Sequence, residues 1–285
     1  MRKKSVFRIS VWSSYFKELK PETMVDTFLA HGLDCSELSD EHGWALLEKP
    51  RPRNAIGKFK KYCDEKSFSF PQGHFYLTAN LAEPHKKSRI KLVDDLKKWC
   101  DLFNDLDVKA GVLHPGPLEI KKNLRNAPDS EKRALENIVS TLEELLAYSK
   151  GMSFVICLEN LIENFDCYSD ISALIRKIRG GEKLGICLDT GHLNWCNGNC
   201  AEFAVKAGAK LKALHITDCM GPGLDHILPF GGGKVDWKAL IKALRKIHYS
   251  GLFNFEIPKE TNCPMPIRLK KLDYIVNLAG EMMNL

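Results

Sequence analysis

The stretch GICLDTGHL at residues 185–193 poses the question on which the fold depends. A short apolar run ends in Asp189, and His192 follows three residues later. Such a run at 185–189 is typical of a strand buried on both faces, as in a parallel sheet covered by helices. The aspartate is then either a helix N-cap or a ligand in one wall of a metal site. The rest of the chain separates these two interpretations.

Similar runs recur along the chain and alternate with amphipathic segments. Eight of them predict strands, at residues 6–11, 34–38, 69–73, 111–114, 154–159, 185–189, 213–217 and 253–257. Apolar residues at helical spacing predict helices at 23–32, 88–103, 130–149, 170–178, 237–248 and 266–283. No linker or low-complexity tract interrupts this alternation. It therefore predicts one domain over residues 1–285, an α/β fold of the (β/α)8 TIM barrel type. An open doubly wound sheet is the alternative, but no glycine-rich loop follows the first strand.

The composition is that of a globular protein. The 285 residues are 44% hydrophobic and 27% charged, and no stretch approaches the roughly 20 apolar residues that span a bilayer. The basic start MRKK leads into an apolar run interrupted by Arg8, without a small-residue cleavage site, so we expect no secretory leader. Ten cysteines without paired CxxC spacing predict buried, reduced thiols and a cytoplasmic location. The net charge of +6 permits an anionic substrate and is weak evidence for nucleic acid.

Residue types that bind metals stand at seven of the eight predicted strand ends. From the second strand to the eighth they are Glu37, His74, His114, Glu159, Asp189 with His192, His215, and Glu256. Each alone has an ordinary explanation, such as a cap or a hydrogen-bonded core histidine. In a barrel, however, the carboxyl ends of the strands meet at one mouth. Glu159, Asp189 and Glu256 would repel one another there, and a divalent cation relieves that repulsion. The sequence therefore predicts a metal site.

The residues from His114 onward stand in the motifs VLHPG, CLEN, CLDTGHLN, LHITD and FNFEI, and LPFGGGKVDW lies between the last two of these. With them the chain resembles the xylose-isomerase-like barrel superfamily, which includes sugar isomerases and epimerases and also endonuclease IV. The resemblance implies one divalent ion (Mn, Mg, Co or Zn) bound by Glu159, Asp189, His215 and Glu256. It also implies that Glu159 and Glu256 remove and return a proton on the carbon next to a metal-held carbonyl. The implied substrate is a small sugar or sugar phosphate, and pairing into a homodimer is common in the superfamily.

The endonuclease IV branch implies a different function, zinc-dependent cleavage of DNA at abasic sites. Its members have histidines at the positions of His74 and His114 and an Asp-x-His after the seventh strand. Here Asp225 directly precedes His226, and Leu224 stands two residues before that histidine. The residues expected to bind substrate or an additional metal are His74, His114, His192, His226, Asp225 and Glu37. We favour an isomerase or epimerase, with the AP endonuclease as the alternative. Lyase or dehydratase chemistry and a non-catalytic binding barrel are further hypotheses.

Overall fold

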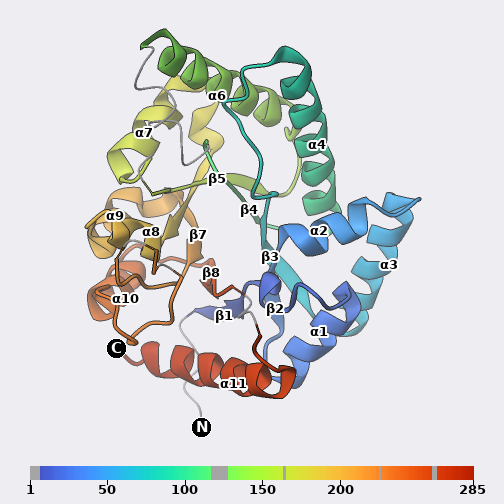
Figure 1. Cartoon of the computed structure of the whole chain (residues 1–285), viewed down its shortest axis with the longest axis vertical. Coiled ribbons are helices and arrows are strands. Elements are labelled where there is room, and N and C mark those ends of the chain that lie inside the picture. Colours follow the sequence, from blue (N-terminus) through green and yellow to red (C-terminus); the bar gives the residue numbers. More distant parts are fainter. Residues whose placement is uncertain (1–6, 117–127, 163–164, 222, 225, 259–261) are drawn as a thin grey trace.

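The computed structural model describes residues 7–116, 128–162, 165–221, 223–224, 226–258 and 262–285, with strands inside and helices outside (Figure 1). The strands are β1 Arg8–Val11, β2 Cys35–Leu38, β3 Ser69–His74, β4 Ala110–Leu113, β5 Val155–Glu159, β6 Gly185–Asp189, β7 Leu211–His215 and β8 Leu252–Phe255. The helices are α1 Pro21–Ala30, α2 Asp40–Leu47, α3 Pro52–Glu65, α4 Lys86–Asp105, α6 Pro128–Tyr148, α7 Tyr168–Lys177, α8 Thr190–Trp195, α9 Cys200–Ala207, α10 Trp237–Lys246 and α11 Met265–Met282.

The strands pair in parallel and in sequence order, which gives an α/β fold of the TIM-barrel type. Strands β2 to β7 form one six-stranded sheet, and β1 pairs with β8. The two sheets meet at two single bridges, Trp12 with Glu37 and Ile216 with Phe255. Strands β1, β2 and β8 have only four residues each, which leaves little length for pairing at these seams. Continuous pairing therefore extends over six strands and not around the closed ring of eight that the sequence predicts.

Most predicted strand bounds are shifted by one or two residues in the structure. β4 ends at Leu113 and β8 at Phe255, so His114 and Glu256 each follow directly after a strand. β7 begins and ends two residues earlier than predicted, which makes His215 its last residue. The shifts leave these ligand-type residues at or next to the carboxyl end of their strands, except Glu37, one residue before the end of β2, and His192, which lies in α8.

Four helices were not predicted, namely α2, α3, α8 and α9. Each has a local start signal in the sequence, and Asp189 and Asn199 cap α8 and α9 with their side chains. The Ser39 hydroxyl accepts a hydrogen bond from the His42 amide and caps α2, and Pro52 occupies the first position of α3. α8 and α9 are short, with six and eight residues. Short helices present too few turns for a clear periodic pattern.

The core has two layers. Small side chains fill the inside of the barrel, from Ala110, Val112, Cys157, Cys187 and Ala213, while larger apolar residues pack between strands and helices. Phe103 of α4 lies so close to β3 and β4 that a Cβ at Gly73 would meet its ring at 2.7 Å. Glycine in β3 thus permits the close approach of α4.

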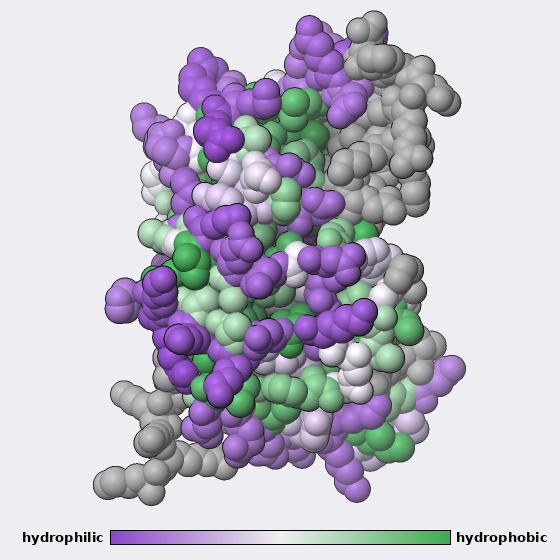
Figure 2. Space-filling view, turned by 90° about the vertical axis from the view of Figure 1, so that its left-hand side faces the viewer, coloured by the Kyte–Doolittle hydropathy of each residue, from purple (hydrophilic) through white to green (hydrophobic). Residues whose placement is uncertain are grey.

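The surface and the thiols agree with the composition. Hydrophilic residues cover much of the face in Figure 2, with apolar residues scattered between them. Within the described ranges, no helix has both the length and the apolar character needed to cross a bilayer. All ten cysteines are free thiols, most of them buried.

Candidate metal centre at the carboxyl ends of the strands

Four ligand-type side chains converge at the mouth of the barrel. Glu159, Asp189 and His215 are the last residues of β5, β6 and β7, and Glu256 follows β8 directly. One ligand atom from each lies within 4.8 Å of the others. All four side chains are buried, Glu256 being the most exposed at 4%. The fold thus collects three carboxyl groups and one imidazole in a small volume away from water.

The same four residues each carry one buried polar atom that has no hydrogen-bond partner. These atoms are Glu159 Oε1, Asp189 Oδ2, His215 Nδ1 and Glu256 Oε2. His215 Nδ1 lies 3.0 Å from Glu256 Oε2 and 3.2 Å from Glu159 Oε1, without hydrogen-bond geometry. Buried polar atoms are almost always satisfied, because an unsatisfied one is expensive. A divalent cation that prefers oxygen and imidazole ligands would satisfy all four atoms at once, so the residues fit a metal.

The buried carboxylate of Glu37 orients His215 through the ring nitrogen that does not face the cluster. The Nε2 atom of His215 donates to Glu37 Oε1 at 3.1 Å, so Nδ1 is the ring nitrogen that faces the cluster. Glu37 also accepts from Gln72 Nε2 at 3.0 Å and from Asn254 Nδ2 at 2.6 Å. Hydrogen bonds of this kind fix the tautomer and ring orientation of a ligating histidine. The sequence predicts Glu37 as a substrate or additional metal ligand, whereas the structure places it behind His215.

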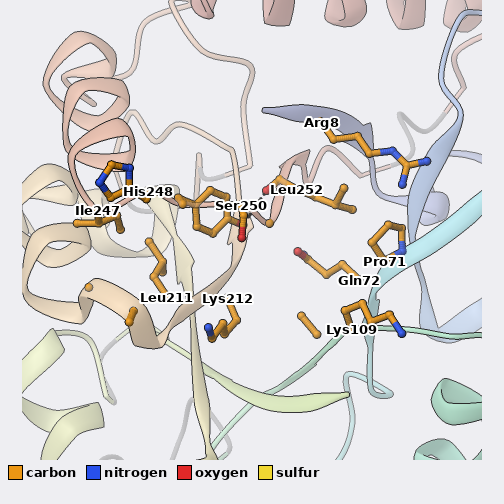
Figure 3. A pocket seen from close by; sticks show the side chains of 15 residues that line it. Arg8, Pro71, Gln72, Lys109, Leu211, Lys212, Ile247, His248, Ser250 and Leu252 are labelled. Carbon is orange, nitrogen blue, oxygen red and sulfur yellow. Dashed lines mark hydrogen bonds between the residues drawn. The ribbon is translucent and has the colours of Figure 1, made fainter. Parts of the chain in front are cut away.

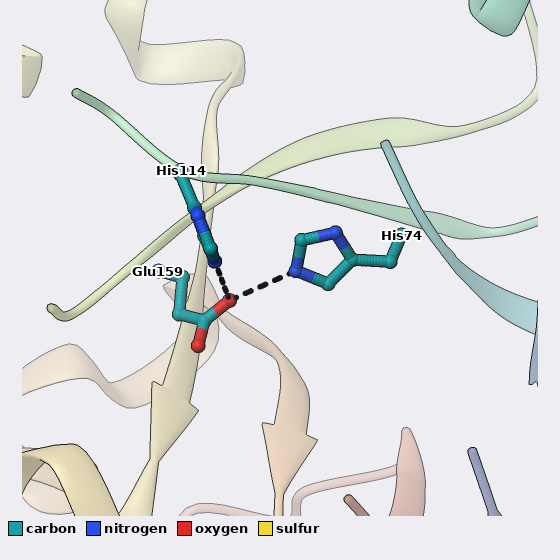
Figure 4. A group of neighbouring side chains, drawn as sticks. All are labelled: His74, His114 and Glu159. Atoms are coloured by element: carbon teal, nitrogen blue, oxygen red, sulfur yellow. Dashed lines mark hydrogen bonds and ion pairs between the residues drawn. The ribbon is translucent and has the colours of Figure 1, made fainter. Parts of the chain in front are cut away.

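His74 and His114 approach the second carboxylate oxygen of Glu159. Their Nε2 atoms lie 3.2 and 3.4 Å from Glu159 Oε2 (Figure 4). His74 Nδ1 donates to the Phe75 carbonyl at 2.5 Å, so Nε2 is the atom available to accept or ligate. Glu159 therefore directs one oxygen to the four-atom cluster and the other to this imidazole pair. The three residues form a second group with ligand atoms in range of one another.

His192 and His226 form a third group with Asp189. Asp189 Oδ1 accepts from the His192 amide at 2.6 Å and caps α8, while Oδ2 belongs to the four-atom cluster. His192 Nδ1 donates to the Asn160 carbonyl at 3.1 Å, and His226 Nε2 lies 3.4 Å from Glu256 Oε2. Asp225 lies outside the described residues.

Comparison with known proteins gives the family of the chain. A family model described as xylose isomerase-like TIM barrel matches residues 25–275. The chain belongs to this family. The chain is also similar to the uncharacterized protein y4fM of Sinorhizobium fredii, with 28% identity over 64% of this chain and 57% of y4fM. The probable endonuclease 4 of Aquifex aeolicus is 26% identical over 80% of this chain and 83% of its own length.

The match to the first two curated relatives covers less than two thirds of their length. The Plasmodium berghei apurinic-apyrimidinic endonuclease 1 is 28% identical over 62% of this chain but only 36% of its own. Solved structures show the family fold over almost the whole chain. A D-tagatose 3-epimerase-like protein has a TM-score of 0.77 at 21% identity and covers 98% of both chains. A D-psicose 3-epimerase has a TM-score of 0.78 at 15% identity, over 97% of this chain and 99% of its own.

The charges at the mouth of this family member are strongly coupled. Burial alone would raise the pKa of the Glu159 and Glu256 carboxyls, but the charge of His215 beside them holds both well below the usual range. Burial raises the pKa of Asp189 to about 7. Burial opposes a charge on His74 and His192, yet Glu159 and Asp189 respectively raise their pKa values to about 9. Without a metal, protonated imidazoles balance the carboxylates.

Three supporting residues were not found from the sequence. Asn160 donates to the Asp189 carbonyl at 2.9 Å and accepts from its amide at 2.8 Å. Its position directly after Glu159 in CLEN is the only sequence signal. Gln72 and Asn254, which hold Glu37, are buried polar residues within β3 and β8. Nothing local distinguishes them from other polar residues, because only the folded barrel brings them to Glu37.

Proposed function

We propose that the chain is a single (β/α)8 barrel enzyme that isomerises or epimerises a small sugar with the help of one divalent metal. The observation that carries the proposal is the pair Glu159 and Glu256, which both extend an oxygen into the four-atom cluster. A bound divalent cation would polarise the substrate carbonyl and so acidify the neighbouring C–H. Beside a bound divalent cation both glutamates would be ionised and so able to accept a proton. Asp189 and His215 complete the proposed ligand set.

The proposed proton transfer uses the two glutamates in turn. Glu159 on β5 takes the proton from the substrate carbon, and Glu256 after β8 returns one, or the reverse for the opposite reaction. Glu37 and Asn160 keep His215 and Asp189 in place. His192 and the partly exposed His226 lie beside the cluster, where their imidazoles can hydrogen-bond to substrate hydroxyls. Asp225 is proposed with them from its sequence position alone.

A specific observation also supports the AP endonuclease as a second candidate. Glu159 Oε2 lies between His74 and His114, and this arrangement suits a second metal that shares Glu159 with the first. The similarity to the probable endonuclease 4 of Aquifex aeolicus points the same way. Leu224 argues against the nuclease, since this apolar residue stands where the resemblance to that branch implies the aspartate of an Asp-x-His. We therefore keep the sugar enzyme as the first proposal.

The remaining properties follow from this proposal. The substrate would be a sugar or sugar phosphate, the enzyme would act in the cytoplasm, and a homodimer would be its assembly. Lyase or dehydratase chemistry would begin with the same proton removal by Glu159 or Glu256.

Isotope exchange and metal content test the proposal together. The purified chain is loaded with Mn, Mg, Co or Zn, and bound metal per chain is determined by elemental analysis. A panel of ketohexoses and their phosphates is then incubated with it in deuterium oxide and followed by NMR, and a duplex with one abasic site is assayed for cleavage. One metal and deuterium at the carbon next to the carbonyl would support the sugar enzyme. Cleavage of the duplex without exchange in any ketose would replace it by the nuclease.

A further inference from the structure

A pocket lies at the opposite end of the strands from the candidate metal centre. Its lining includes the first residues of four strands, Arg8 of β1, Ala110 of β4, Leu211 of β7 and Leu252 of β8. Its volume is about 460 Å³, within the range of small-molecule sites. The proposed function uses none of the charged residues that line this pocket, although Gln72 of the lining also holds Glu37 behind His215.

The charge of this pocket is entirely positive. Arg8, Lys109 and Lys212 line it, and no aspartate or glutamate does. Arg8 pairs with Asp34 at 3.0 Å, but neither lysine forms an ion pair with any residue in the described part of the chain. The two lysines are exposed and have flexible stems, so their ammonium groups can turn toward an anion.

A neighbouring pocket provides a useful contrast. It shares Arg8 and Lys109 with the first pocket but also contains Lys60, Asp64 and Asp107. Lys60 lies 2.6 Å from Asp64 and 3.1 Å from Asp107, so its charge is already balanced. Of these two pockets, the one beside Lys212 combines unpaired lysines with the absence of lining acids. An anion would therefore prefer that pocket.

Gln72 supplies a second and independent observation. Its side chain extends toward the middle of the pocket, between Lys212 on one side and Arg8 and Lys109 on the other (Figure 3). Gln72 is only 1% exposed. Its Nε2 donates to Glu37 Oε1 and to the Leu214 carbonyl, which assigns the other atom as oxygen. That Oε1 is buried and has no hydrogen-bond partner.

The unpaired lysines and the unpartnered Gln72 oxygen together indicate which kind of ligand the pocket binds. The lysines favour an anion, and the Gln72 oxygen requires a donor such as a hydroxyl. We propose that the pocket binds a small phosphomonoester that also carries a free hydroxyl, such as a phosphorylated polyol or sugar. Its phosphate is held by Lys109, Lys212 and Arg8, and its hydroxyl donates to Gln72 Oε1.

Calorimetric titration with glycerol 3-phosphate tests this site on the full, metal-loaded chain. The double variant K109Q/K212Q removes the two unpaired charges. The matched control K238Q/K242Q removes two equally exposed lysines on α10 that do not line the pocket. Wild type and control are expected to bind alike, and K109Q/K212Q at least about tenfold more weakly. Circular dichroism establishes that both variants are folded.

The outcomes separate this pocket from the metal centre. A ligand bound only at the metal centre would keep its affinity in K109Q/K212Q, and that result would overturn the proposal. A lack of binding to the wild type at about 1 mM ligand would overturn it as well. Two sites in the wild type and one in K109Q/K212Q would support it, because the remaining site is the one that does not depend on the lysines.

Discussion

Asp189 at the end of β6 and Asp218 three residues after β7 are both buried carboxylates, yet their surroundings differ. Asp218 Oδ1 accepts from the amides of Cys219 at 2.8 Å and Lys234 at 3.0 Å, and Oδ2 accepts from Trp237 Nε1 at 3.2 Å. Asp189 Oδ1 caps α8, but its Oδ2 has no partner. Hydrogen bonds within the protein therefore satisfy both carboxylate oxygens of Asp218. These bonds also fix the loop before α10. Asp189 retains an unused acceptor beside three others, as expected of a ligand-binding site.

The largest effect is expected from E256Q. Glutamine has almost the same shape as glutamate but cannot accept and return a proton. Deuterium exchange into the substrate should fall by about 10³-fold or more, while circular dichroism stays unchanged. E281Q, at an exposed position of α11, is the matched control and should keep full activity. An E256Q enzyme within tenfold of wild type would remove Glu256 from the proposed proton transfer.

D189N should mainly affect the metal. Asparagine still caps α8 through its oxygen, but the anionic ligand atom is lost, and the metal Kd should rise by about 100-fold. Metal titration of wild type and variant measures this change. A Kd within threefold of wild type would exclude Asp189 as a ligand.

In the metal-free chain, D189N should make the free energy of unfolding less dependent on pH. The pKa of Asp189 is raised from 3.8 to about 7, so between these values the folded chain holds a proton that the unfolded chain has lost. Wild-type stability in a chelator should therefore fall as the pH rises from about 4 to 7. D189N should lose less stability over this interval, and urea unfolding at each pH measures the difference. Equal pH profiles would contradict the raised pKa.

These contrasts explain what the sequence could and could not predict. The apolar runs locate the strands, and the ligand-type residues at their ends indicate which side chains meet. The sequence presents a helix cap and a metal ligand as alternatives for Asp189, whereas its two oxygens are divided between the two tasks. Gln72 and Asn254 could not be found, because the barrel register alone brings them to Glu37. The single bridges at the seams likewise depend on the paired lengths of distant strands.

D218N should affect stability and not the metal. Asparagine keeps one acceptor oxygen for the backbone amides at the Oδ1 position, but its Nδ2 would then face the Trp237 indole N–H, which needs an acceptor. The free energy of unfolding should fall by about 2 to 3 kcal/mol, while metal affinity changes little. D236N is the matched control, since asparagine can replace the exposed Asp236 as the cap of α10. A large loss of metal affinity in a fully stable D218N protein would contradict the purely structural role assigned to Asp218.

Metal binding should also depend on pH. Burial opposes a charge on His215, but Cys187 and the carboxylates of Glu256 and Glu37 raise its pKa well above the usual value. The imidazole must lose this proton before Nδ1 can bind a metal. Affinity should therefore rise about tenfold per pH unit for each proton released, between about pH 6 and 8. Calorimetry in buffers of different ionisation heat counts the protons. A pH-independent affinity would mean that His215 is already neutral, and the metal-free mouth would then lack the positive charge that balances Glu159 and Glu256.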